Sequence, residues 1–266
     1  MANSPAQPLL GKAALVTGGS SGIGRAAALA LAQAGADVAV NYFTLEESAQ
    51  ELAREVTALG RRVLLLPVDI SDQAAVDGMV ERAARDLGRL DLLVSAAAYS
   101  DRELFHLADL AGFRRTVDVT MWGAFYVLRA VANVLIRQGQ GGAVVVVGSG
   151  HAHTPLPSCM AYNMAKAANE QMARTAAIEL ARHRIRVNLV HPGWTDTPGE
   201  RKFFSEEALR QGSGQLPWGR LARPEEVARV ILFLLDPASD YITGATYAVD
   251  GGASLPWWSK RGTGAF

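Results

Sequence analysis

Hydrophobic and polar positions divide this chain into short apolar runs separated by longer amphipathic stretches. The apolar runs predict strands near residues 12–17, 36–41, 62–68, 90–95, 143–148, 185–190 and 245–249. The stretches with helical spacing predict helices near residues 23–34, 45–59, 72–87, 103–109, 112–137, 158–182, 202–210 and 224–235. Because strands and helices alternate, we expect right-handed crossovers and a mostly parallel sheet with helices on both faces.

Individual residues support this division. The run from 143 to 147 is apolar at every position, which is typical of a strand that is covered on both faces. Pro224 is followed by two acidic residues, as at the start of a helix. Glycine follows three predicted helices, as C-terminal caps often do: Gly35, Gly60 and Gly88. No repeat or linker divides the chain, so we predict a single three-layer α/β domain over residues 1–266.

Composition narrows the functional classes. The 266 residues are 49% hydrophobic, which is enough for one core, and the net charge of +0 argues against nucleic acid as a partner. Cys159 is the one cysteine, so no disulfide can form within the chain. Residues 1–8 do not resemble a secretory signal, and no apolar run reaches the roughly 18 residues that span a membrane. We therefore expect a cytoplasmic protein without membrane association.

A glycine-rich turn follows the first predicted strand and opens the first predicted helix. This setting is typical of a dinucleotide site in a doubly wound sheet, the Rossmann fold. Gly18 allows a sharp turn, Gly22 allows close approach of a pyrophosphate, and Gly24 allows the helix to pack on the strand. The helix N-terminus presents N–H groups to the phosphates. The residues of this predicted site are Gly18, Ser20, Ser21, Ile23, Gly22 and Gly24.

A second group of residues predicts acid–base chemistry. Tyr162 and Lys166 are four residues apart, so on a helix they share one face. A cation beside a phenol lowers the pKa of the phenol toward the range of a general acid or base. Ser149, thirteen residues before the tyrosine, can hold a carbonyl or hydroxyl oxygen by a hydrogen bond. The three side chains therefore predict proton transfer at such an oxygen.

The glycine-rich turn, Ser149 and the Tyr162–Lys166 pair together resemble the short-chain dehydrogenase/reductase family, in its branch of single domains. The resemblance implies a Rossmann fold, an NAD(P)(H) cofactor and hydride transfer between the nicotinamide and a small-molecule alcohol or ketone. Tyr162 and Lys166 would also contact the cofactor. The other cofactor-binding residues that it implies are Tyr42, Asp69, Ala96, Pro192, Gly193, Thr195 and Thr197. Val249–Gly252 matches the last strand and turn of the family.

Two segments depart from the family pattern. Ser95–Ala98 stands where the family has Asn-Asn-Ala-Gly, and Thr120 stands where it has a catalytic asparagine. That asparagine helps to hold a water that links the lysine to solvent. We expect Thr120 to hold this water, although its hydroxyl lacks the amide N–H. The departures leave open a non-catalytic dinucleotide-binding redox sensor. Because a fold does not fix chemistry, another reaction on the same fold, such as enoyl reduction or dehydration, is a further alternative.

The end of the second predicted strand bears on the choice of cofactor. Tyr42 occupies the position where NAD-dependent relatives carry an aspartate, so no carboxylate there repels a 2′-phosphate. We expect Asn41, Tyr42 and Thr44 to donate hydrogen bonds to that phosphate. NADP(H) is therefore favoured, with NAD(H) as the alternative.

The substrate pocket is expected at the carboxyl ends of the strands. Residues 192–221 form a long connection with glycines and prolines, which predicts a substrate lid. The side chains expected to line the pocket are His151, His153, Tyr99 and Trp194, with Asp101 nearby. We predict no metal site at His151, His153 and His191, because no carboxylate or further ligand accompanies them at a recognisable spacing.

The C-terminal residues 253–266 extend beyond the last predicted strand. They include Trp257, Trp258 and Phe266, which we expect to pack on a neighbouring subunit or to close a pocket. The predicted helices 112–137 and 158–182 are long and suit a helix-bundle interface. We therefore predict a homotetramer or a homodimer.

Overall fold

The computed structural model describes residues 7–256. Seven strands pair in parallel in the order β3-β2-β1-β4-β5-β6-β7. The strands are β1 (Ala13–Thr17), β2 (Asp37–Tyr42), β3 (Val63–Pro67), β4 (Leu92–Ser95), β5 (Gly142–Val147), β6 (Ile185–Pro192) and β7 (Thr246–Val249). The strand order reverses direction between β1 and β4, and ligands of such sheets bind outside the carboxyl ends of the strands at this point.

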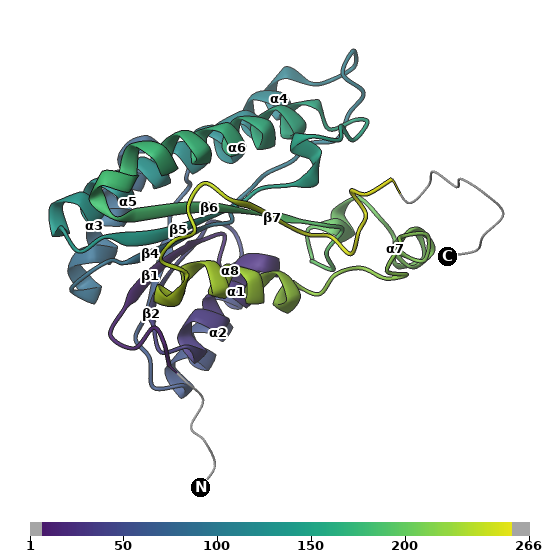
Figure 1. The fold of residues 1–266 in the computed structure, drawn as a ribbon. Coiled ribbons are helices and arrows are strands. Elements are labelled where there is room, and N and C mark those ends of the chain that lie inside the picture. The colour runs from purple at the N-terminus through teal and green to yellow at the C-terminus, as the bar shows by residue number, and fades with distance from the viewer. Residues whose placement is uncertain (1–6, 257–266) are drawn as a thin grey trace, which may run out of the picture.

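Helices cover both faces of the sheet (Figure 1). One layer contains α3 (Gln73–Leu87), α4 (Leu110–Val117), α5 (Gly123–Gln138) and α6 (Met160–Leu180). The opposite layer contains α1 (Gly22–Gln33), α2 (Glu46–Ala58) and α8 (Pro224–Leu235). The short helix α7 (Glu206–Ser213) stands apart from both layers (Figure 1). The predicted three-layer, doubly wound fold is therefore confirmed.

The apolar strands are buried because both of their faces pack against helices. In β1, Ala13 and Leu15 join the core beneath α3 and α5, whereas Ala14 and Val16 join the core beneath α1 and α8. The valines of β5 divide in the same way between the two cores. A strand that alternates between two apolar layers has no polar face, which explains its continuous hydrophobic run.

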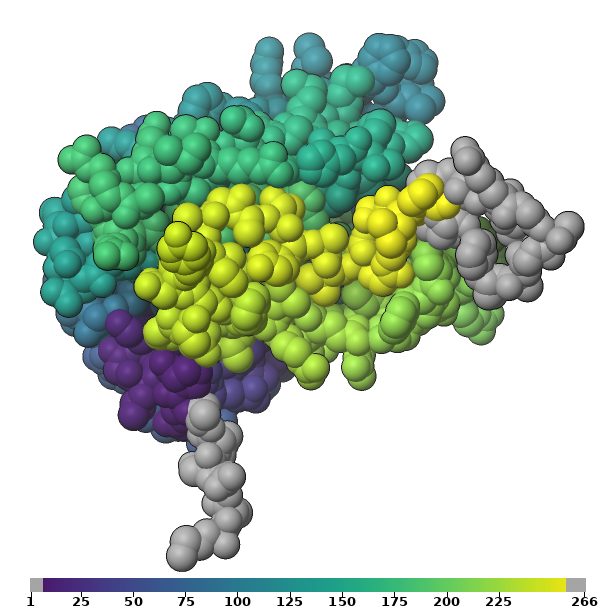
Figure 2. All heavy atoms as spheres, viewed as in Figure 1, coloured from purple at the N-terminus to yellow at the C-terminus, as the bar shows by residue number. Residues whose placement is uncertain are grey.

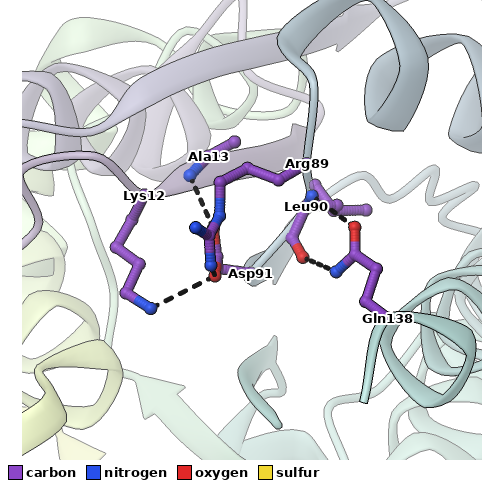
Figure 3. A network of polar contacts seen from close by, with 6 residues as sticks. All are labelled: Lys12, Ala13, Arg89, Leu90, Asp91 and Gln138. Atoms are coloured by element: carbon purple, nitrogen blue, oxygen red, sulfur yellow. Dashed lines mark hydrogen bonds and ion pairs between the residues drawn. The ribbon is translucent and has the colours of Figure 1, made fainter. Parts of the chain in front are cut away.

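A buried carboxylate joins the amino ends of two neighbouring strands (Figure 3). Asp91, just before β4, accepts a hydrogen bond from the backbone N–H of Ala13 at 3.0 Å. Its carboxylate also pairs with Lys12 at 3.2 Å and with Arg89 at 2.5 Å. These contacts compensate the charge of the buried carboxylate. Both strands start in register there, at the edge opposite the predicted site.

Three predicted helices differ from the observed ones. The segment 103–109 forms no helix, and α4 begins only at Leu110, because the Asp109 carboxylate caps it by accepting from the N–H of Gly112 at 2.9 Å. The predicted helix 112–137 contains a π-helical turn, η1 (Asp118–Trp122), between α4 and α5. The predicted helix 202–210 is replaced by a 3₁₀ turn, η4 (Glu200–Lys202), and by α7 after its cap Ser205.

The helical run from Leu110 to Gln138 is long and apolar enough to cross a membrane by length and composition, although it contains charged residues. Within its most apolar 18-residue window, 61% is buried inside the protein. Its apolar side chains, such as Val127 and Val131, belong to the core between the sheet and the helices α3 and α5. The core therefore accounts for its hydrophobicity.

The C-terminal part of the described chain lies across one face of the molecule. In Figure 2 the yellow segment that carries β7 runs between green residues of α6 and yellow-green residues of α8. Residues 253–256 follow the turn after β7. Trp257, Trp258 and Phe266, which we expected to pack on a partner or a pocket, lie outside the described residues.

Candidate active site

The glycine-rich turn occupies the crevice between β1 and β4. Gly18 has φ +63°, and a Cβ there would be 2.8 Å from the Cα of Ala97. A Cβ on Gly24 would be 2.3 Å from the carbonyl oxygen of Gly18. Neither position can hold a side chain without moving the backbone. The turn thus brings the N-terminus of α1 close to the sheet, where its free N–H groups can face an anion.

Residues after β6 lie against this turn. A Cβ on Gly22 would be 3.0 Å from the Cγ2 of Thr197, so the two segments are in contact. Gly193 follows β6, and its N–H donates to the carbonyl of Val249 at 2.9 Å. The hydroxyl of Thr195 donates to the carbonyl of Gly193 at 2.9 Å. The structure therefore brings Thr197 against Gly22 of the glycine turn, whereas Pro192 pairs with Val249 at the end of β6.

The segment after β4 closes the third side of the crevice. The hydroxyl oxygen of Thr17 accepts from the N–H groups of Ala96 at 3.1 Å and Ala97 at 3.3 Å. The backbone of Ala96 and Ala97 thus lies directly against Gly18, where a Cβ on the glycine would be 2.8 Å from the Cα of Ala97.

The end of β2 differs from our expectation about Asn41. Its amide donates to the carbonyls of Leu66 at 3.1 Å and Val68 at 2.9 Å, so it joins β2 to β3 and is not free to bind a phosphate. Tyr42 is buried, and this burial together with the charge of Glu46 raises the pKa of its phenol. Ser21 is the residue before α1, and its side chain makes no capping hydrogen bond to this helix.

Asp69 lies beyond β3, where it begins the turn into α3. Its carboxylate accepts from the N–H and the hydroxyl of Ser71 and pairs with Arg115 at 2.8 Å. Burial opposes ionisation of this carboxyl, but the contacts with Ser71 and Arg115 outweigh it and hold the pKa of Asp69 below its usual value. The guanidinium of Arg115 also lies 5.8 Å from the centre of the Phe43 ring.

The structure brings Ser149, Tyr162 and Lys166 together at the carboxyl end of β5. Ser149 follows this strand, hydrogen-bonds with the Tyr162 phenol and accepts from the N–H of His151 at 3.2 Å. Tyr162 and Lys166 lie one turn apart on α6. The Nζ of Lys166 donates to the carbonyl of Val147 at 2.7 Å and lies 5.4 Å from the centre of the Tyr162 ring.

Burial dominates the electrostatics of this pair. It raises the pKa of Tyr162 to about 12, although the hydrogen bond with Ser149 opposes the shift. It also lowers the pKa of Lys166 to about 8. Our expectation that the lysine lowers the pKa of the tyrosine is therefore not met in this structure. The phenol is protonated at neutral pH and can donate its proton to an oxygen.

Thr120 does not have the free hydroxyl that we expected to hold a water. Its Oγ1 accepts from the N–H of Tyr99 at 2.9 Å and donates to the carbonyl of Tyr99 at 2.7 Å. The carbonyl of Thr120 accepts from the amide of Asn169 at 2.8 Å. Because the single hydroxyl proton is used within the protein, Thr120 cannot donate a hydrogen bond to a water. Its role here is to attach the loop after β4 to η1.

The predicted pocket residues separate into two groups. The His151 ring lies 6.5 Å from the Tyr162 ring, centre to centre, and Tyr99 is 40% exposed on the loop after β4. His153 instead pairs with Glu170, and Trp194 donates to Glu200 at 2.9 Å and packs on Phe204. His153 is thus paired with α6 at Glu170, whereas His151 is the histidine with a ring contact to Tyr162. Trp194 supports the segment that we predicted as a lid.

Two charged residues near Tyr162 were missed by sequence reasoning. Arg102, after β4, and Glu200, in η4, both act electrostatically on the Tyr162 phenol. They lie 3.5 Å apart, and the Arg102 guanidinium is 3.7 Å from the centre of the Phe203 ring. One feature of the sequence could have indicated them: each residue follows a predicted strand, so each is expected at the carboxyl edge of the sheet, where the site lies.

Comparisons with known proteins agree with this geometry. The family model described as enoyl-(acyl carrier protein) reductase matches residues 18–254. The chain is 37% identical to an L-rhamnose 1-dehydrogenase (NAD(P)(+)) of Sphingomonas sp. (strain SKA58), covering 92% of this chain and 96% of that protein. It is 36% identical to a cis-4-hydroxycyclohexanecarboxylate dehydrogenase of Sinomonas cyclohexanicum, covering 91% and 96%. The crystal structure of a short-chain type dehydrogenase/reductase from Mycobacterium marinum has a TM-score of 0.86 and 33% identity, covering 93% and 97%.

Proposed function

Because this chain belongs to the short-chain dehydrogenase/reductase family, a family of oxidoreductases, we propose that it interconverts a secondary alcohol and a ketone with NAD(P)(H). One observation supports the proposal most: the hydrogen-bonded Ser149 and Tyr162 stand with Lys166 at the carboxyl end of β5. The glycine turn after β1 is part of the same edge of the sheet.

The chain's own residues fit a dinucleotide. Gly18 and Gly24 leave no room for a side chain between the turn and the sheet, and the N-terminus of α1 can receive the pyrophosphate. Thr195, Thr197 and Lys166 would hold the nicotinamide end, and Asp69 the adenine end. When bound, the nicotinamide supplies or accepts a hydride at its C4 atom.

Each catalytic side chain has its own task in this proposal. Ser149 orients the substrate oxygen by a hydrogen bond. Tyr162 donates its phenolic proton to that oxygen during reduction and takes the proton back during oxidation. Lys166 positions the cofactor ribose and, when charged, favours the phenolate. Ser149 and Lys166 are buried, which strengthens their electrostatic interactions.

The proposed cofactor is NADP(H) rather than NAD(H), because Tyr42, at the end of β2, stands where a carboxylate would repel the 2′-phosphate. Asn41 is no longer a proposed ligand of the 2′-phosphate, because its amide donates to the carbonyls of Leu66 and Val68. Tyr42 and Thr44 remain as the proposed donors. The relative that oxidises L-rhamnose has NAD(P)(+) in its name, and this name supports either cofactor.

The proposed substrate is a cyclic alcohol or a sugar. Both curated relatives named above oxidise ring compounds with hydroxyl groups, as their names state. His151, Arg102 and Glu200 would supply polar contacts around the Tyr162 phenol. The dehydrogenase names of these relatives favour alcohol oxidation over enoyl reduction or dehydration.

The remaining proposals concern assembly, location and the lid. We keep a homotetramer or a homodimer in the cytoplasm as the proposed state of the protein. Residues 192–221 would cover the substrate, since Thr197 contacts the glycine turn and Glu200 acts on Tyr162. A redox sensor remains the second candidate function, favoured by Thr120, whose hydroxyl is not free to donate to a water.

A direct assay tests the proposal. Purified protein is incubated with NAD⁺ or NADP⁺ and with L-rhamnose, cis-4-hydroxycyclohexanecarboxylate and other secondary alcohols, and the absorbance of reduced nicotinamide is followed. We expect turnover with at least one alcohol, and a loss of several orders of magnitude in kcat for Tyr162→Phe. The fully exposed Tyr241 offers the control Tyr241→Phe, which should keep its activity. Cofactor binding without turnover across the panel would support the sensor instead.

A further inference from the structure

A cluster of three side chains lies behind the candidate active site, and the mechanism above does not use it. His153 follows the short helix η2 (Gly150–Ala152), Glu170 belongs to α6, and His191 lies in β6. One ligand atom from each residue lies within 4.8 Å of the others. Two imidazoles and a carboxylate from three separate elements thus converge on one point.

Of the two distances that end at the Oε2 of Glu170, one matches the spacing of zinc ligands and the other is shorter. The Nε2 of His191 lies 3.6 Å from the Oε2 of Glu170, and the Nε2 of His153 lies 2.7 Å from the same oxygen. Tetrahedral Zn²⁺ with bonds of about 2.0–2.2 Å separates its ligand atoms by roughly 3.3–3.6 Å. His191 already meets this spacing. His153 has a side chain that is 61% exposed, so its ring can move outward by the remaining fraction of an ångström.

Glu170 is a buried carboxylate, and acidic side chains are rarely buried. Its side chain is only 5% exposed, and the guanidinium of Arg174, one turn further on α6, lies 2.5 Å from its Oε1. Buried carboxylates require compensation by charges or hydrogen bonds. The ion pair with Arg174 involves Oε1, whereas the other oxygen, Oε2, lies next to the two histidines.

His191 supplies an independent observation. Its side chain is 6% exposed, and its Nε2 is a buried atom without a hydrogen-bond partner among the described residues. A Cβ on the neighbouring Gly148 would lie 2.7 Å from this nitrogen, so the ring fits only beside a glycine. A buried polar atom without a partner is uncommon and calls for a ligand.

We propose that His153, Glu170 and His191 form a binding site for one Zn²⁺ ion. Two imidazole nitrogens and one carboxylate oxygen are borderline ligands of the kind that zinc prefers over calcium or magnesium. A water supplies the fourth ligand from the solvent side, next to the exposed His153. The sequence argued against a metal because no carboxylate has a recognisable spacing to the histidines; the carboxylate comes from a separate helix.

The ion has a structural consequence for the candidate active site. It ties the loop from Ser149 to His153 to α6 and β6, the elements that carry Tyr162 and the segment after β6. Without the ion, the loop is already joined to α6 through His153 and Glu170, and Ser149 contacts Tyr162. The ion adds His191 of β6 to these contacts and thereby strengthens the placement of Ser149 relative to Tyr162. The site itself does not depend on the proposed reaction.

Metal binding to the tag-free protein tests the proposal. The chain contains five histidines, so any affinity tag is removed and the protein is treated with a chelator and dialysed. Zn²⁺ binding is measured by titration calorimetry, and Co²⁺ serves as a spectroscopic probe because tetrahedral cobalt absorbs strongly in the visible range. We expect one Zn²⁺ per chain, a tetrahedral cobalt spectrum, and a melting temperature that rises with zinc.

Two variants and a control separate this site from weak surface binding. His153→Ala removes an exposed ligand without disturbing the core and should weaken zinc binding by about tenfold or more. Glu170→Gln keeps the shape of the side chain but removes its charge, and circular dichroism checks its fold. His106→Ala, at an exposed position outside the cluster, should bind zinc like the original protein. Binding that is absent, or unchanged in His153→Ala, would show a hydrogen-bonded network only and overturn the proposal.

Discussion

The guanidinium of Arg102 lies 3.7 Å from the centre of the Phe203 ring and 3.5 Å from the carboxylate of Glu200. Arg102 belongs to the loop after β4, whereas Phe203 and Glu200 belong to the segment that we propose as a lid. A guanidinium over an aromatic face combines packing with electrostatic attraction. This contact therefore holds the proposed lid against the rest of the active site.

Arg102→Ala should release the lid from this contact. We expect KM for the alcohol to rise about tenfold with a smaller change in kcat, because Tyr162 and Ser149 keep their places. Steady-state kinetics measures both constants. Arg82→Ala, which removes an exposed arginine from α3, is the control. If the two variants have equal KM values, the contact does not hold a substrate lid.

Thr120 makes a second contact that can be tested by substitution. Its buried hydroxyl bonds to both the N–H and the carbonyl of Tyr99. Thr120→Val keeps the shape but leaves these two groups without a partner, and we expect a loss of about 1–3 kcal/mol in the free energy of unfolding. Thr120→Ser should recover most of it. Thr57→Val removes an exposed hydroxyl from α2 and should change stability by less than about 0.5 kcal/mol in urea unfolding.

Two glycines of similar helical setting should respond oppositely to alanine. A Cβ on Gly24 would meet the carbonyl oxygen of Gly18 at 2.3 Å, so Gly24→Ala should shift the turn and weaken dinucleotide binding at least tenfold. A Cβ on Gly78, inside α3, would meet nothing within 4 Å, so Gly78→Ala should stabilise the protein by roughly 0.5–1 kcal/mol. Fluorescence titration with NADPH measures the affinity of Gly24→Ala, and thermal unfolding measures the stability of Gly78→Ala. Normal NADPH affinity in Gly24→Ala would contradict the proposed dinucleotide site.

Hydrophobic periodicity was sufficient to predict the sheet, because the strands alternate between two apolar cores. The predicted caps Gly35, Gly60 and Gly88 all have positive φ, since glycine adopts that conformation without steric cost. The predicted helix at 103–109 was wrong: Leu104 and Leu107 are spaced like a helix face but remain more than half exposed. Periodicity cannot show whether an apolar face has anything to pack against.

The polar details of the site depend on contacts between distant parts of the chain. The amide of Asn169 meets the carbonyl of Thr120, and Glu170 meets His153 and His191, although these residues belong to different elements. Spacing along the sequence cannot show such pairs. The glycine turn and the Tyr162–Lys166 pair could be recognised because each lies within a single short segment.

The opposite pKa shifts of Lys166 and Tyr162 predict how stability depends on pH. The folded pKa of Lys166 is about 8, below its unfolded value of 10.5, so the unfolded chain binds more protons between these values. Stability should therefore rise with pH in this window, by roughly 1–3 kcal/mol between pH 8 and 10. Above pH 10 the sign reverses, because the unfolded tyrosine loses its proton at 10.0, whereas folded Tyr162 keeps it up to about 12.

Urea unfolding of the original protein and of Lys166→Met at several pH values isolates the contribution of Lys166 to the pH dependence of the unfolding free energy. Both proteins contain the same other titrating groups, so these cancel in the difference between the two unfolding free energies. We expect the destabilisation of the original protein relative to Lys166→Met to be largest at or below pH 8 and to shrink as the pH rises, because well above 10.5 the lysine is neutral in both the folded and the unfolded state. A difference that stays constant over this range would mean that Lys166 keeps an ordinary pKa in the folded protein. The carbonyl of Val147 would then stabilise the ammonium enough to offset its burial.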